Sequence, residues 1–272
     1  MFLAFMIASP AAQHVGVRVP DPDERVGTPL AKPEPRRPVG EAPQRIFQKL
    51  TSKSEDERRT AAQQLGWGTE NLPPASDARL LLVHLDADDE QEAILVISNP
   101  LGTVAFVFDR QKEAWWRIGK FSYWWHWDAN QAERIIELRE IVRSGSKDII
   151  VRERAGGTGI ATTDLSIYRL HNGRLYRVFQ IAEDEYYNRY GAAATVTETR
   201  RIEYPNADST GRVFLVVHHR ATTEPDLPTR RNPITEKSDC SAYRWDSNRF
   251  TFVVDGQAAR QLCKTRDAGK SQ

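Results

Sequence analysis

The chain has 272 residues, of which 38 are Lys or Arg and 37 are Asp or Glu, so its formal net charge is +1. Such a small imbalance provides no electrostatic attraction for nucleic acid or for an anionic membrane surface. A hydrophobic fraction of 40%, with seven Trp, eight Tyr and ten Phe, predicts a globular body that can bury a sizeable core.

The N-terminal residues predict export followed by a spacer. Residues 1–12, MFLAFMIASPAA, form a short apolar run that ends in small residues, as a signal peptide does, although no Lys or Arg precedes it. The alternative is a frayed apolar terminus, and the run is shorter than the roughly 20 apolar residues of a transmembrane helix. Residues 13–41 are rich in proline, which predicts a linker. We therefore expect a periplasmic or secreted protein, or a cytoplasmic one if the apolar run is no signal.

Two short helices are expected within residues 42–68. Ile46, Phe47 and Leu50 share one face of the first, while Ser54 begins the second with a capping-box pattern and Gly66 ends it. The segment LTSKSEDERRTAAQQLG, residues 50–66, resembles half of a HEAT repeat. Because stacked helical repeats need about three units, this single unit predicts a helical cap rather than a solenoid.

At residue 79 the hydrophobic period changes from about 3.6 to 2, and it stays near 2 as far as residue 256, which predicts strands. The strands fall into three groups of four, and the ends of the third strands match, IYRL at 167–170 against AYRW at 242–245. The fold class predicted is mainly β, with three repeated four-stranded antiparallel units, propeller-like or stacked as sheets, and a short helical cap. A β sandwich with accidental similarity is the alternative, and residues 257–272 form a C-terminal tail.

The three units resemble degenerate integrin-type repeats (FG-GAP or VCBS-like), in which an acidic calcium loop leads into a hydrophobic strand. Residues 86–90, DADDE, stand in that place before EAILVI, whereas the two later units lack alternating carboxylates. The resemblance implies a β-propeller-like body, although closed propellers typically have four to eight blades and only three units are counted here.

Three acidic residues are candidates for a metal site. Asp86, Asp88 and Glu90 alternate in a turn, and their oxygens suit Ca²⁺, which is the only cofactor that the sequence indicates. However, Gln91 replaces the expected glycine and Ile94 the later carboxylate, so the alternative is a solvated acidic turn. The glycine loop AGGTG, residues 155–159, lacks a following helix and a Lys, which predicts a hairpin connection rather than a phosphate loop.

An aromatic cluster provides the candidate binding surface. Trp115 and Trp116 are adjacent on a predicted strand and must therefore face opposite sides. Exposed Trp side chains suit sugar stacking or a protein interface, whereas packing between sheets is the structural alternative. The residues assigned to this surface are Trp115, Trp124, Trp125, His126, Trp127 and Asp128. His218 and His219 likewise face opposite sides of a strand, and the sequence assigns no catalytic residue.

Cys240 and Cys263 are the two cysteines of the chain, and in an exported protein they predict a disulfide bond. The function predicted is an exported binding or structural module of the cell envelope, with a protein or a glycan as partner and self-association as a further possibility. Two other functions stay open: a carbohydrate-active enzyme on a propeller-like scaffold, and an intracellular protein-interaction domain.

Overall fold

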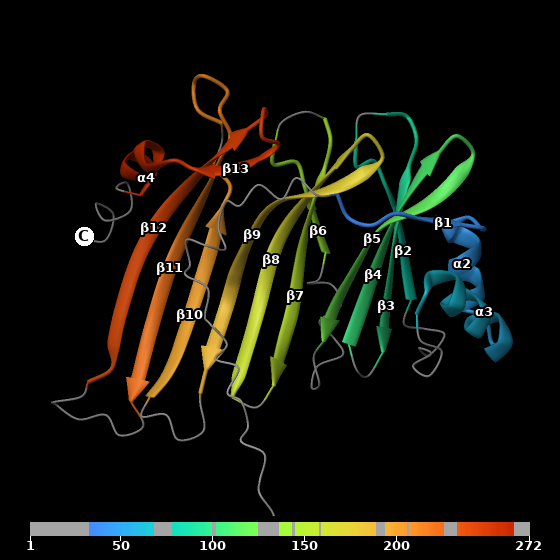
Figure 1. The fold of residues 1–272 in the computed structure, drawn as a ribbon, viewed down its shortest axis with the longest axis horizontal. Helices are drawn as coiled ribbons and strands as arrows, with labels where there is room; N and C mark the ends of the chain where they lie inside the picture. Colours follow the sequence, from blue (N-terminus) through green and yellow to red (C-terminus); the bar gives the residue numbers. More distant parts are fainter. Residues whose placement is uncertain are drawn as a thin grey trace, which may run out of the picture.

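The computed structural model describes residues 33–67, 78–86, 88–99, 102–124, 136–142, 145–157, 159–188, 194–205, 207–225 and 233–263. The chain is mainly β, as predicted, and its strands form two antiparallel sheets that lie side by side along the long axis of the molecule (Figure 1). The predicted signal peptide, most of the predicted linker and most of the C-terminal tail lie outside the described residues. Within the described residues, no helix is both long and apolar enough to cross a membrane.

The smaller sheet has five strands in the order β1-β5-β4-β3-β2. The strands are β1 (Arg37–Val39), β2 (Ala78–Val83), β3 (Glu92–Asn99), β4 (Gly102–Gln111) and β5 (Ala114–Trp124). Four of them are the predicted first unit, and β1 is an addition from the predicted linker. Arg37 pairs with Arg117 of β5, so the end of the proline-rich segment is part of the sheet.

The larger sheet has eight strands in the order β13-β12-β11-β10-β9-β8-β7-β6. The strands are β6 (Ile136–Arg139), β7 (Asp148–Gly157), β8 (Ile160–His171), β9 (Arg174–Tyr187), β10 (Ala194–Glu203), β11 (Phe214–Pro225), β12 (Thr235–Asp246) and β13 (Thr251–Val254). All eight lie where the second and third units were predicted. Because β9 pairs directly with β10, the two predicted units form one continuous sheet rather than two separate blades.

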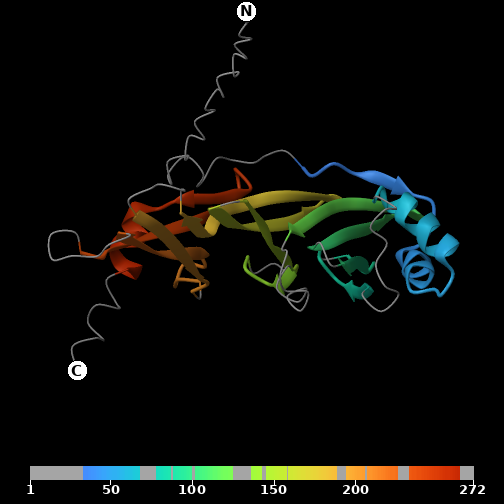
Figure 2. The same cartoon turned by 90° about the horizontal axis from the view of Figure 1, so that it is seen from below.

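Helices α2 (Pro43–Leu50) and α3 (Glu55–Leu65) cover the outer face of the smaller sheet at one end of the molecule (Figure 2). The Ser54 side chain accepts a hydrogen bond from the backbone N–H of Glu57, and Gly66 ends α3 with φ of +64°. Ile46, Leu50 and Leu65 are fully buried against Leu95 and Phe106 of the sheet. The predicted helical cap is therefore anchored by an apolar stripe.

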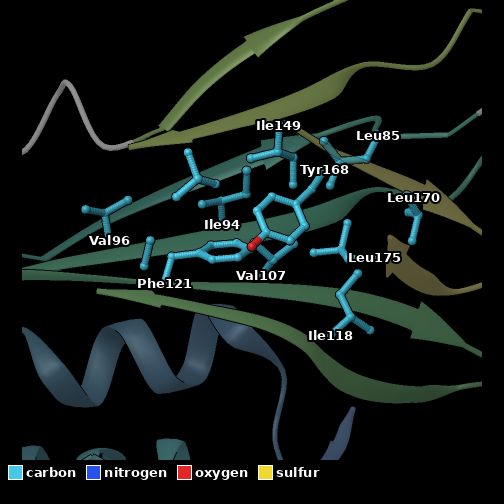
Figure 3. Close-up of a cluster of buried hydrophobic side chains, with 12 residues drawn as sticks. Leu85, Ile94, Val96, Val107, Ile118, Phe121, Ile149, Tyr168, Leu170 and Leu175 are labelled. Atoms are coloured by element: carbon cyan, nitrogen blue, oxygen red, sulfur yellow. The ribbon is translucent and has the colours of Figure 1, made fainter. Parts of the chain in front are cut away.

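The main core lies between the two sheets (Figure 3). Ile94 and Ile118 of the smaller sheet pack here against Ile149 and Tyr168 of the larger sheet, and the ring of Tyr168 lies 4.7 Å from that of Phe121. Alternate residues of β3 point to opposite faces, so Leu95 packs beneath the helices while Ile94 packs between the sheets. Both faces of the smaller sheet are thus buried at β3, which accounts for the continuous apolar run of this strand.

The far end of the larger sheet folds back on itself. Strand β13 crosses over β9, where the hydroxyl of Thr251 donates to the carbonyl oxygen of Val178 at 2.8 Å. Helix α4 (Gly256–Leu262), which the sequence pattern did not predict, packs on β12 through Ala258. The predicted disulfide between Cys240 of β12 and Cys263 holds this helix to the sheet.

Candidate functional site

The structure places only part of the predicted tryptophan surface. Trp115 is half-buried on β5 and packs against the core beneath helices α2 and α3. Trp116 points to the opposite side, as predicted, where the Arg36 guanidinium lies 4.0 Å from its ring centroid. Trp124 ends β5, but its side chain lies outside the described residues, as do Trp125, His126, Trp127 and Asp128 in full. Trp115 thus contributes to packing, and the rest of the predicted surface stays a prediction.

The loop between β2 and β3 brings carboxylates together. Its conformation is held locally, because Asp86 Oδ1 accepts from the Asp88 N–H at 3.1 Å and Asp88 Oδ1 accepts from the Glu90 N–H at 2.9 Å. Asp86, Asp88 and Glu92 each offer a carboxylate oxygen, and these oxygens lie within 4.8 Å of one another. Partial burial and the neighbouring Asp88 charge raise the pKa of Asp86.

Glu92 begins strand β3 and is the buried member of this group. Its side chain is fully buried, and its Oε2 accepts a hydrogen bond from the backbone N–H of Leu85 at 2.5 Å. Its Oε1 has no hydrogen-bond partner within the described part of the chain. Burial, together with the charges of Asp86 and Asp109, raises the pKa of Glu92 to about 7.

Asp109 of β4 adds a fourth carboxylate to the site. Because Ala93 pairs with Phe108, the same register places Asp109 directly across from Glu92. Asp109 is 3% exposed, and its Oδ2 accepts a hydrogen bond from the Gln111 side chain at 2.6 Å. Burial raises the pKa of Asp109 to about 6, and the Asp86 and Asp88 charges act in the same direction.

Strands β7 and β8 of the larger sheet contain a corresponding cross-strand pair, in which a basic residue takes the place of Asp109. Ile149 pairs with Tyr168, which places Arg169 across from Asp148 at the first position of β7. Arg169 Nη1 lies 3.1 Å from Asp148 Oδ1, and Asp148 Oδ2 accepts from the backbone N–H of Ile141. Ile141 precedes Asp148 by seven residues, as Leu85 precedes Glu92. A buried carboxylate is therefore held in the same way at both sites, but among the described residues an arginine neutralises it only in the larger sheet.

A cleft of about 740 Å³ opens beside the four carboxylates, within the range of small-molecule sites. It lies where the hairpin turn after β4 meets the turn after β8. There the Gln111 side chain covers the face of Gly173, whose φ is +66°, so closely that no Cβ fits between them. The cleft is lined by Asp86, Asp88, Glu90, Asp109, Arg110, Gln111, Lys112, Ser146, Arg169, Leu170, His171, Asn172 and Gly173.

The predicted metal set is partly brought together. Asp86 and Asp88 converge as expected, whereas Glu90 lies on the cleft wall and Glu92 takes its place in the group. Carboxylate oxygens are the donors that Ca²⁺ prefers, and one buried oxygen of Glu92 has no partner within the described residues, so the residues present fit this cation. A charged residue at the head of an apolar strand, in EAILVI as in DIIVRE, is the sequence signal that points to Glu92.

Two further sequence predictions are confirmed. Gly157 pairs with Ile160 at the start of the β7–β8 hairpin, where Gly159 has φ of +79°, so the glycine loop is a hairpin connection. His218 lies 3.3 Å from Glu203, whereas His219 contacts Asp239 at 3.0 Å on the opposite face of β11. The side chains of the two histidines therefore lie on opposite faces of the sheet.

Comparison with family models, with curated proteins and with solved structures finds no match for this chain.

Proposed function

We propose that this protein is an exported binding module whose β body holds a divalent cation, Ca²⁺, at Asp86, Asp88, Glu92 and Asp109. The observation that carries the proposal is the fully buried Glu92 carboxylate, one oxygen of which has no partner within the described residues while two further carboxylates lie within 4.8 Å.

Folding removes the carboxylates of Glu92 and Asp109 from water. An ionised carboxylate that is buried without a counter-ion is strongly disfavoured, and it either takes up a proton or gains a cation. Asp148 meets this requirement with Arg169, at 3.1 Å. At the corresponding position of the smaller sheet the arginine is replaced by Asp109, which adds negative charge. A bound dication would neutralise the carboxylates of Glu92 and Asp109, as the Arg169 guanidinium neutralises Asp148.

The coordination number supports a binding role in addition to a structural one. Ca²⁺ takes six to eight oxygen ligands. One oxygen of Asp86 and one of Asp88 are engaged by backbone N–H groups, and Glu92 Oε2 is engaged by Leu85, so each residue has one oxygen left for the metal. Four residues that each provide one oxygen leave several positions for oxygens from the cleft, supplied by water or by a ligand.

The disulfide between Cys240 and Cys263 supports an oxidising compartment, because such bonds persist in exported proteins and are rare in the cytosol. The apolar run at residues 1–12 points in the same direction. Extracellular Ca²⁺ sites commonly bind in the 10⁻⁴ to 10⁻³ M range, which a site of a few monodentate carboxylates on an open cleft would match.

Calorimetric titration of the metal-free chain with CaCl₂ tests the proposal. The wild type should bind Ca²⁺ with a stoichiometry of about one ion per chain. Glu92→Gln should weaken binding by at least about tenfold, because it removes a charged ligand. Asp89→Asn is the matched control, since Asp89 is exposed in the same loop and lies outside the converging group. Equal losses in both variants would reduce the effect to general electrostatics and count against a defined site.

A further inference from the structure

An aromatic patch adjoins the cleft through His171, which is one of the lining residues. It is formed by His171, Tyr176, Trp245 and Phe250, which we call the aromatic rim. The His171 ring lies 5.0 Å from the Phe250 ring and 6.3 Å from the Tyr176 ring, and the Trp245 ring lies 5.3 Å from that of Phe250. His171 is exposed and lines the cleft, so it joins the rim to the cleft.

One residue of the aromatic rim has an unusual backbone conformation. Phe250 has φ of +53°, a left-handed conformation that is unusual for a bulky residue and is often found at functional sites. This conformation ends the turn after β12 and places the Phe250 ring between His171 and Trp245. The other three rim residues are half-buried, which leaves part of their ring surface accessible. Aromatic faces of this kind stack on flat apolar surfaces of a ligand.

The charges in the cleft disfavour an anionic ligand. Asp86, Asp88, Glu90 and Asp109 line it, and with buried Glu92 their negative charge exceeds that of one dication. Both guanidinium groups in the lining are already paired, Arg169 with Asp148 and Arg110 with Glu113. A phosphate or a second carboxylate would therefore meet net repulsion.

The lining instead mixes hydrogen-bond donors and acceptors. Asn172 offers both, Lys112 offers donors, and Glu90 offers acceptors. Hydroxyl groups both donate and accept, and a pair of adjacent hydroxyls can supply two oxygens to a calcium ion. The part of the ligand that lies on the rim must be apolar and flat. A sugar ring has these properties: hydroxyls at its edge and C–H groups on its face.

We propose that the cleft binds a neutral saccharide, with adjacent hydroxyls of one sugar completing the coordination of the cation and the ring stacking on the aromatic rim at His171. This inference rests on the proposed function, since it requires the cation. Specificity would come from the side chains of the two hairpin turns that meet at the cleft.

The test is an array of neutral and acidic oligosaccharides probed with the full chain in CaCl₂ and in EDTA. We expect retention of neutral saccharides in CaCl₂ and none in EDTA. His171→Ala should weaken saccharide binding by about tenfold, the order of one lost stacking contact, while Ca²⁺ binding measured by calorimetry is unchanged. Tyr186→Ala is the matched control, because Tyr186 is an exposed aromatic residue at the other end of β9.

The outcomes separate the two proposals. Normal Ca²⁺ binding with no neutral saccharide retained, or with acidic saccharides alone retained, would overturn the saccharide inference and leave the cation site intact. Saccharide retention that persists in EDTA, or an affinity that is unchanged in His171→Ala, would also overturn it. A wild type that binds no Ca²⁺ would overturn both proposals. Circular dichroism of each variant establishes that the β fold is retained.

Discussion

Replacing Glu92 by Gln should stabilise the metal-free protein and reduce its stabilisation by Ca²⁺. The Gln side chain has nearly the same size as Glu and keeps an oxygen that can accept the hydrogen bond from the Leu85 N–H. It removes the charge that burial disfavours. One substitution is thus expected to raise the free energy of unfolding in EDTA and to reduce the increase that CaCl₂ produces.

The magnitude in EDTA follows from the raised pKa of Glu92. In the unfolded chain this carboxyl titrates near 4.5, and in the folded protein its pKa is about 7. Because the folded-state pKa is raised, the carboxyl favours folding fully below pH 4.5 and loses that contribution as pH rises through 7. A shift of this size corresponds to about 3 kcal/mol at pH 8. Solvent in the open cleft screens the charge, so the expected gain from Glu92→Gln is about 1–2 kcal/mol.

Urea denaturation at pH 5 and pH 8 provides the assay. In EDTA, wild type should lose stability between these pH values, and Glu92→Gln should lose less, with Asp109 still titrating near 6. At a Ca²⁺ concentration a hundred times the wild-type Kd, the wild type should gain about 2.7 kcal/mol, whereas a variant with at least tenfold weaker binding should gain about 1.4 kcal/mol or less. Asp89→Asn should behave as wild type within about 0.5 kcal/mol. A Glu92→Gln variant less stable than wild type in EDTA at pH 8 would refute the account of a buried, unpaired carboxylate.

Two further predictions concern charge and covalent structure. The double variant Glu92→Asp, Asp109→Arg reproduces the Asp148–Arg169 pair in the smaller sheet. It should lose Ca²⁺ binding in calorimetry and should be at least as stable in EDTA as wild type; persistent Ca²⁺ binding would contradict the equivalence of the two strand pairs. Replacing Cys240 and Cys263 by Ser should lower the free energy of unfolding by about 3 kcal/mol, because the disulfide closes a loop with a sequence separation of 23. Thiol titration of the natively folded wild type should find no reactive thiol, and two titrating thiols would contradict the bond.

Much of the fold was predictable because its signals are local. All twelve strands of the three predicted units are present, as are the two helices of the cap, since period-2 alternation and the Ser54 and Gly66 end signals depend on neighbouring residues alone. Strand β1 was missed because Arg37–Val39 lies in a proline-rich stretch and becomes a strand only by pairing with β5. Helix α4 was missed because its seven residues have a weak apolar pattern and are anchored by the disulfide.

The candidate site was predictable in part for the same reason. Asp86 and Asp88 belong to one short loop, so their proximity follows from the sequence. Asp109 joins them only because β3 and β4 pair in a particular register. His171 comes from the other sheet, and its position at the cleft depends on how the two sheets pack.

The sequence by itself determined the strands, the cap, the hairpin turns and the acidic loop, because hydrophobic periodicity and turn chemistry act over a few residues. Only the tertiary structure decided that the second and third units share a sheet, since that depends on pairing between β9 and β10 rather than on either strand alone. It also decided that Glu92 lies across from Asp109, whereas Asp148 lies across from Arg169. Burial and cross-strand register create this difference in charge, and they arise when distant segments pack.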